Sequence, residues 1–257
     1  MVQVFTRDQA QAYVADLYRR VAERWEERVM QSEFMTHLCD GSLPLSVFRL
    51  FFRNFGTFTI EINTMVAASY QRYLHFFRQY PDLMEALGEK IADEFIHPRP
   101  PGHVLLVLQT ARALDIDPQE IYTAPYLPEF RCRLDFARAV LYEGTPAEWF
   151  ALSSNEEMIG HWAGACYTAL TTHYGLTPEQ VVYFSKHHEA DLEEHDEGVM
   201  GHGQFNRLVL QRLLESGQAW ERPTYGIEYC AMTFVDLFGV SLRGIMDVAR
   251  RQRLVPD

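Results

Sequence analysis

The chain has few lysines, and this shortage excludes one class of protein. Lys90 and Lys186 are its only lysines, and acidic residues outnumber basic ones, giving a formal net charge of −12 at pH 7. Nucleic-acid binding depends on clustered basic side chains that neutralise phosphates. We therefore expect no nucleic-acid partner.

Cysteines and long apolar runs are also scarce. The four cysteines show none of the paired spacings typical of zinc fingers or thiol redox motifs. The N-terminus lacks a basic segment followed by an apolar one, as a signal peptide would have. The sequence also contains no run of about 18 apolar residues, the length needed to cross a bilayer. The sequence predicts a cytoplasmic protein with reduced thiols and no membrane partner.

Signals for β-strands are missing as well. No turn dipeptide separates alternating apolar runs, and most glycines and prolines lie between segments of helical periodicity. A chain of 257 residues with 47% hydrophobic residues can bury a substantial core. We expect an all-α fold, with residues 1–257 forming a single helical bundle of about eight or nine helices.

Capping signals give the expected helix boundaries. Thr6 and Gln9 form a capping-box pattern at the start of the first helix, and Thr145 and Glu148 form another. Further helices are expected over 45–77, from 81 to the HPRPPG segment, from 103, over 129–143, from 146 to the break at 175, over 205–214 and over 224–254.

The stretch YFSKHHEADLEEHDEGVM, residues 183–200, holds the densest group of metal-binding side chains. If Thr177 caps a helix that begins at Pro178, one face carries Val181, Phe184, His188, Asp191, His195 and Val199. Apolar residues at both ends predict that this face points into the protein. A buried carboxylate needs a partner, and a metal ion would satisfy Asp191 and both histidines together.

Two other helices offer acids on or near apolar faces. Glu61 is a lone acid in a long uncharged stretch, where pairing with a buried Arg or Tyr explains it equally well. Glu94 and His97 extend an apolar stripe with the Glu-x-x-His spacing of carboxylate-bridged metal sites. A solvent-facing helix end is the simpler explanation of that pair alone. His103 is the rival imidazole, although capping or packing its own helix explains it more simply.

A fourth candidate acid closes another helix. Glu143 ends a stripe with Cys132, Phe136 and Val140, just before Gly144. Solvent exposure explains it equally well, and Glu156 and Glu157 are competitors for the same role. Taken together, carboxylates and imidazoles from four helices suit a pair of iron or manganese ions better than zinc.

On these residues, roughly from 40 to 250, the chain resembles the haem-oxygenase-like diiron oxidases and oxygenases. Thiaminase-type and pyrroloquinoline-quinone-synthase-type proteins share that fold without a metal. The matching positions are Glu61, Glu94 and His97, Glu143 within EGTPAEW, His187 or His188, Asp191 and His195. The Glu-x-x-His and EGTPAEW segments are most similar to fatty-acid decarboxylases that make terminal alkenes.

The chain departs from the family pattern at its last histidines. The family tends to show HxxxDxxH, whereas here His188 and His195 keep the separation of seven but Asp191 comes one residue early. Reading His187 as the first ligand restores HxxxD but places Glu194 in the final position. The choice between these ligands stays open.

The resemblance implies a cofactor and a reaction class. It implies two Fe(II) ions per chain, O2, and a fatty-acid-like or amino-acid-like substrate that undergoes oxidative decarboxylation, C–C cleavage, desaturation or N-oxygenation. An external reductant and a homodimer are compatible with it. Lys186 and several tyrosines leave open a self-sacrificing aminobenzoate-synthase type.

Two other functions fit the same sequence. One is a metal-free enzyme of the same fold, thiaminase-like or a cofactorless oxidase, for which Cys230 is the candidate thiol. The other is a non-catalytic helical binding protein whose inward polar residues form a hydrogen-bonded network.

Overall fold

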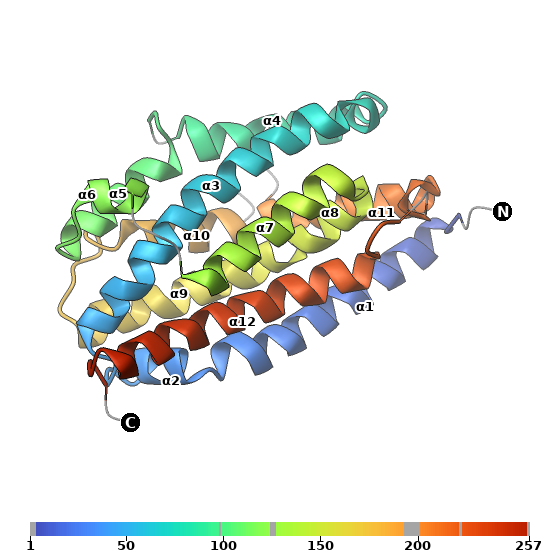
Figure 1. Cartoon of the computed structure of the whole chain (residues 1–257). Coiled ribbons are helices and arrows are strands. Elements are labelled where there is room, and N and C mark those ends of the chain that lie inside the picture. The colour runs from blue at the N-terminus through green and yellow to red at the C-terminus, as the bar shows by residue number, and fades with distance from the viewer. Residues whose placement is uncertain (1–3, 98, 124–126, 193–200, 221–222, 256–257) are drawn as a thin grey trace.

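The computed structural model describes residues 4–97, 99–123, 127–192, 201–220 and 223–255, without the side chains of 189–192. Every regular element within these ranges is helical, which confirms the all-α prediction. Figure 1 shows the long helices lying lengthwise beside one another in an elongated bundle. Among them α12 packs against α7 and α8, and α10 packs against α9.

The described residues contain α-helices numbered α1 to α12, more than the eight or nine expected. The short α6 lies in a segment expected only to connect helices, and the helix expected from 146 to 175 is divided into α8 and α9. The short α2 agrees with the turn of helix that the sequence indicates near residues 34–39. The α-helices are α1 (Arg7–Trp25), α2 (Glu33–Cys39), α3 (Leu45–Phe77), α4 (Pro81–Phe95), α5 (His103–Ala113), α6 (Pro118–Thr123), α7 (Pro128–Glu143), α8 (Pro146–Leu152), α9 (Glu156–His173), α10 (Val182–Leu192), α11 (His202–Glu215) and α12 (Ile227–Arg251).

Capping residues and prolines place most helix starts where the sequence predicts them. Both predicted capping boxes form, because the side chains of Thr6 and Thr145 accept the N–H groups of Gln9 and Glu148. The helices α3, α4 and α5 begin at 45, 81 and 103 as expected. Short-range chemistry therefore sets these boundaries.

The expected helix start at Pro178 is four residues too early. Residues 178–181 form a turn, and α10 begins at Val182. The N–H of Thr177 donates to the side chain of Gln180 at 2.8 Å, which closes one local turn before the helix. Asp191 lies in α10, but its side chain is outside the described residues, and so are Glu194 and His195.

A cluster of aromatic rings holds α10 in place. Trp162 of α9 lies 5.8 Å from Phe184 of α10 and 5.1 Å from Phe55 of α3, measured between ring centroids. Phe184 also contacts Phe52, at 5.9 Å. Because residues three apart share a helix face, this packing directs His187 towards α3 and the interior.

One helix is apolar enough to cross a membrane, although no such segment was expected from the sequence. By length and composition α12 meets that requirement, as the one such helix among the described residues. However, 61% of its most apolar window is buried inside the protein. Its buried residues, including Phe234 and Phe238, belong to the hydrophobic core. Core packing therefore accounts for its apolar character.

Glu148 joins the start of α8 to the start of α12. Its side chain is fully buried, and its oxygens accept the N–H groups of Thr145 at 2.7 Å and of Tyr225 and Gly226 at 2.5 Å. Burial raises the pKa of Glu148, but these backbone donors outweigh it and hold the pKa below its usual value. The folded state thus favours the ionised form.

We expect Glu148→Gln to lower the free energy of unfolding by about 1–2 kcal/mol at pH 7, because charge-assisted hydrogen bonds are stronger than neutral ones. The lowered pKa contributes stability above the unfolded-state value of about 4.5, and this contribution is lost as the pH falls below it. The difference between wild type and variant should shrink in acid. Urea unfolding of both proteins at pH 7 and pH 4 tests this, and a constant difference would contradict it.

Candidate metal centre

A cavity lies inside the bundle and takes its lining from α3, α4, α7, α9, α10, α11 and α12 among other segments. It holds about 690 Å³ of empty space, including its opening to solvent. Glu94, His187 and His202 are among its polar lining residues, and Phe55 and Phe234 are among its aromatic ones. A largely apolar cavity with a few convergent polar groups is the usual form of a small-molecule site.

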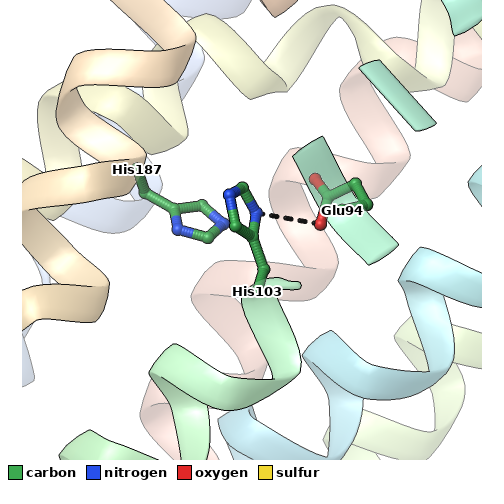
Figure 2. Close-up of side chains that lie close together, drawn as sticks. All are labelled: Glu94, His103 and His187. Carbon is green, nitrogen blue, oxygen red and sulfur yellow. Dashed lines mark ion pairs between the residues drawn. The ribbon is translucent and has the colours of Figure 1, made fainter. Parts of the chain in front are cut away.

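Three side chains of types that can bind a metal lie close together, and two of them, Glu94 and His187, line this cavity. Glu94 comes from the last turn of α4, His103 from the first residue of α5, and His187 from α10 (Figure 2). All three are buried, and one ligand atom from each lies within 4.8 Å of the others. Nδ1 of His103 lies 3.0 Å from Oε2 of Glu94, and the two imidazole rings are 4.7 Å apart.

Neighbouring polar groups orient this cluster. Asn63 of α3 donates a hydrogen bond through Nδ2 to Oε2 of Glu94. Nδ1 of His187 lies 3.2 Å from the carbonyl oxygen of Tyr183, whose ring packs on the imidazole at 4.1 Å. If Nδ1 carries the proton and donates it to that carbonyl, Nε2 keeps its lone pair for a metal.

The charges at the cluster suit metal binding. Burial raises the pKa of Glu94, but the surrounding imidazoles, His103 first and then His187 and His202, together outweigh it and bring the pKa to about 2. Burial, followed by the field of His103, lowers the pKa of His187 to about 3. At neutral pH the carboxylate is therefore ionised and His187 is neutral. One carboxylate and two imidazoles form a donor set that fits iron.

Comparison with known proteins places the fold. No protein-family model matches the chain, and no curated protein does. Several solved structures match over nearly the whole chain, and three of them are described here. A domain of unknown function with a heme oxygenase-like fold from Shewanella denitrificans has a TM-score of 0.69 at 14% identity and covers 93% of this chain and 94% of its own. The chain has the haem-oxygenase-like fold.

Two TenA homologues share this fold with the chain. The protein from Pseudomonas syringae pv. tomato has a TM-score of 0.70 at 12% identity and covers 95% of this chain and 96% of its own. The protein from P. horikoshii has a TM-score of 0.57 at 16% identity and covers 90% and 99%. The resemblance noted in the sequence is thus confirmed as a resemblance of fold. Identities this low say nothing about the reaction.

Within this haem-oxygenase-like fold, the cluster contains two of the predicted ligands, Glu94 and His187, together with the rival imidazole His103. His97 is exposed and lies outside the cluster. The Glu-x-x-His spacing places both side chains on one face only where the helix continues. Here α4 ends at Phe95, and the N–H of His97 bonds to the carbonyl of Ala92, five residues back.

Glu61 lies on a different face of α3 from the cavity. Thr59, Ile62 and Asn63 line the cavity, whereas Glu61 is rotated by about 100° from Ile62. Its side chain is partly exposed, and its carboxylate lies 3.3 Å from the guanidinium of Arg138. The bundle therefore pairs Glu61 with an arginine of α7.

Glu143 also lies away from the cluster. It is exposed, and its carboxylate accepts a hydrogen bond from the hydroxyl of Tyr225 at 2.8 Å. The buried residues of α7 are Phe130, Arg133, Leu134, Ala137, Val140 and Leu141. The stripe through Cys132 and Phe136 lies to one side of this buried face, and so it carries Glu143 outwards.

The competing acids on α9 have basic partners. Glu156 lines the cavity, and its Oε2 contacts Nζ of the buried Lys90. Glu157 forms two hydrogen bonds of 2.8 Å with the guanidinium of Arg207. Each acid is therefore already neutralised by a side chain of another helix.

On α10 the two adjacent histidines point in different directions. His187 is buried in the cluster, whereas His188 is more exposed and its Nδ1 lies 3.0 Å from the carbonyl oxygen of Gly160. Its ring rests against Gly164 of α9, where an added Cβ would come within 2.7 Å of Nδ1. Lys186 is exposed. The roles of Asp191 and His195 stay predictions, since their side chains are outside the described residues.

Sequence reasoning missed several polar residues of the cavity. Asn63 lines the cavity, but it was not predicted because Glu61, two residues earlier, was the only charged residue in that stretch. Nε2 of His202 lies 3.4 Å from Oδ2 of Asp93. In the sequence His202 stands between two glycines, Gly201 and Gly203. Arg133 is fully buried on α7. Its signal is present in the sequence, because Phe130, Arg133 and Ala137 are spaced as one helix face.

Proposed function

We propose that this chain is an iron-dependent enzyme that uses O2 to oxidise a small fatty-acid-like or amino-acid-like substrate. The observation that supports it is the buried group of one carboxylate and two imidazoles from three helices, Glu94, His103 and His187. Fe(II), when bound, supplies the electrons that activate O2. O2 is the partner that this chemistry requires, and an external reductant is compatible with it.

The chain's own residues have distinct tasks in this proposal. Glu94 provides negative charge that offsets the charge of a cation in a buried position. His103 and His187 provide nitrogen ligands, and Asn63 orients the carboxylate of Glu94. The aromatic lining of the cavity, including Phe55 and Phe58, excludes water from the reacting groups.

The proposal includes two iron ions per chain. The three clustered residues suit one ion, and a second ion needs further ligands. Asp191 and His195, on or after α10, stay the predicted ligands for it. Carboxylate-bridged bundles draw such ligands from several helices, and α10 already contributes His187 to the cluster.

Iron counting after anaerobic loading with Fe(II) tests this function. We expect about two irons per folded chain, and O2 consumption that depends on them. Glu94→Ala should remove at least half of the bound iron, because it deletes the only carboxylate of the described cluster. Glu143→Ala is the matched control, since Glu143 is exposed and bonded to Tyr225. Iron measurement by mass spectrometry, with circular dichroism to verify folding, gives both results.

A metal-free enzyme is the second candidate, and one observation favours it. Oε2 of Glu94 already lies against donors of both Asn63 and His103, so this buried carboxylate has partners without a cation. Two of the matching structures are described as TenA homologues. A folded wild-type protein that takes up no iron would reject our proposal and favour this candidate.

The thiol-dependent version of that candidate has less support. Of the described residues that line the cavity, none is a cysteine. Burial raises the pKa of Cys230 to about 12, so its thiol is protonated at neutral pH and is a weak nucleophile.

A further inference from the structure

Arg133 is a fully buried cation in the same cavity as Glu94 and His187. Its guanidinium carbon lies 4.6 Å from the ring centre of Phe58 and 4.3 Å from those of Phe234 and Phe238. These rings come from α3 and α12, and Arg133 itself belongs to α7, so three helices enclose the guanidinium. A buried arginine normally has an acidic partner.

No such partner exists in the part of the chain that the structure describes. The nitrogens Nε, Nη1 and Nη2 of Arg133 are all buried, and none has a hydrogen-bond acceptor among the described residues. Asp135, an acid on the same helix, is half exposed and pairs with Arg131 and Arg138 instead. Within the described ranges, the five N–H donors of Arg133 are therefore left without acceptors.

The phenyl rings explain only part of this arrangement. Contacts with aromatic faces stabilise a desolvated guanidinium, but by less than it costs to leave a buried charge unpaired. Burial lowers the pKa of Arg133 to about 9, so the group stays protonated at neutral pH. Arg133 is thus a cation at the wall of a cavity whose donors no described residue uses.

The surroundings of Arg133 also indicate what kind of molecule fits. The neighbouring rings provide an apolar environment, and Tyr183 of α10 is the titratable group whose field acts on the guanidinium. Tyr183 in turn packs on His187, which belongs to the metal-binding cluster. The cavity therefore connects a cation among phenyl rings with the cluster, through Tyr183.

We propose that Arg133 binds the carboxylate of a small molecule whose apolar body lies in the cavity among Phe58 and Phe234. The guanidinium fork matches a carboxylate with two parallel hydrogen bonds, which no neutral group provides as well. The anion site stands without a metal. The further statement, that the far end of the bound molecule lies at Glu94 and His187, rests on the proposed function.

Ligand binding to the metal-free wild-type protein tests the anion site directly. Hexanoate, hexanol and hexylamine share one apolar body and differ in the head group, and inorganic phosphate is an anion without that body. We expect calorimetry to show hexanoate binding at least about tenfold more tightly than the other three, since charge-assisted hydrogen bonds are stronger than neutral ones. This comparison needs no variant.

Variants then assign the site to Arg133. Arg133→Met should remove the preference for hexanoate over hexanol, and Arg133→Lys should weaken it because lysine lacks the fork. Arg131→Met is the matched control on the same helix and should keep the preference, since Arg131 is exposed. Without ligand, Arg133→Met should melt no lower than wild type, because a buried unpaired charge has been removed.

Several outcomes would overturn the inference. Equal binding of hexanoate and hexanol by wild type would mean that solvent satisfies the donors of Arg133. Phosphate binding as tight as hexanoate would reject the carboxylate assignment, and an unchanged preference in Arg133→Met would place the anion elsewhere. Iron uptake separates this inference from the proposed function. A protein that prefers hexanoate but takes up no iron keeps the anion site and loses the oxidase proposal.

Discussion

Replacing His103 by alanine is expected to lower iron affinity at least about 100-fold, because even the loss of a residue that only orients a metal ligand costs 10–100-fold. His103 is buried and its Nδ1 lies 3.0 Å from Glu94. His97→Ala should leave iron affinity within about twofold of wild type, since His97 is exposed outside the cluster. The two substitutions remove the same chemical group from opposite ends of one loop.

This pair of variants separates two assignments of the imidazole. The Glu-x-x-His spacing assigns it to His97, and the geometry assigns it to His103. Anaerobic titration of each folded variant with Fe(II), followed by competition with a chelator of known affinity, measures the difference. Loss of iron in His97→Ala with retention in His103→Ala would mean that the metal-bound protein continues α4 through residue 97.

A second large effect is expected at Gly102, which immediately precedes α5. Its φ of +68° is disfavoured for residues with a side chain, and an added Cβ would lie 2.2 Å from the carbonyl oxygen of Glu94. Gly102→Ala should therefore lower the free energy of unfolding by about 2–5 kcal/mol. It should also displace His103 from Glu94 and weaken iron binding, because the clash is with the backbone that carries the carboxylate.

Gly88→Ala is the matched control for Gly102. Gly88 lies in α4, is exposed, and has no atom within 4 Å of an added Cβ. Alanine is the better helix former, so this variant should gain about 0.5–1 kcal/mol. Thermal unfolding and iron titration of both variants provide the comparison. A Gly102→Ala protein as stable as wild type would show that the junction of α4 and α5 can relax.

The predicted ligands illustrate how helical periodicity succeeds and fails. The Glu94 position depended on an apolar stripe within a helix that does form, and the structure brings that side chain to the cavity. For Glu143 the assumed stripe ran through Cys132, which is exposed. A shift of one residue rotates a helix face by about 100°, so an acid at the edge of a stripe can point either way.

Arg133, the arginine of the cavity, is a residue whose burial the sequence could have predicted but whose surroundings it could not. Arg133 stands on the buried face of α7, between Phe130 and Ala137, and its position there follows from spacing alone. Spacing says nothing about its neighbours, because Phe58, Phe234 and Phe238 come from helices far away in the sequence. Only the tertiary structure shows that these rings surround the guanidinium and that no described residue accepts its hydrogen bonds.

By itself the sequence determined the all-α class and most helix starts, because caps, prolines and apolar periodicity act over three or four residues. Tertiary structure alone decided which acids and imidazoles meet. It ended α4 before His97, brought His103 back against Glu94 and turned Glu61 towards Arg138. Those outcomes depend on how whole helices rotate and pack against one another, and such long-range contacts are not encoded in the spacing of any single helix.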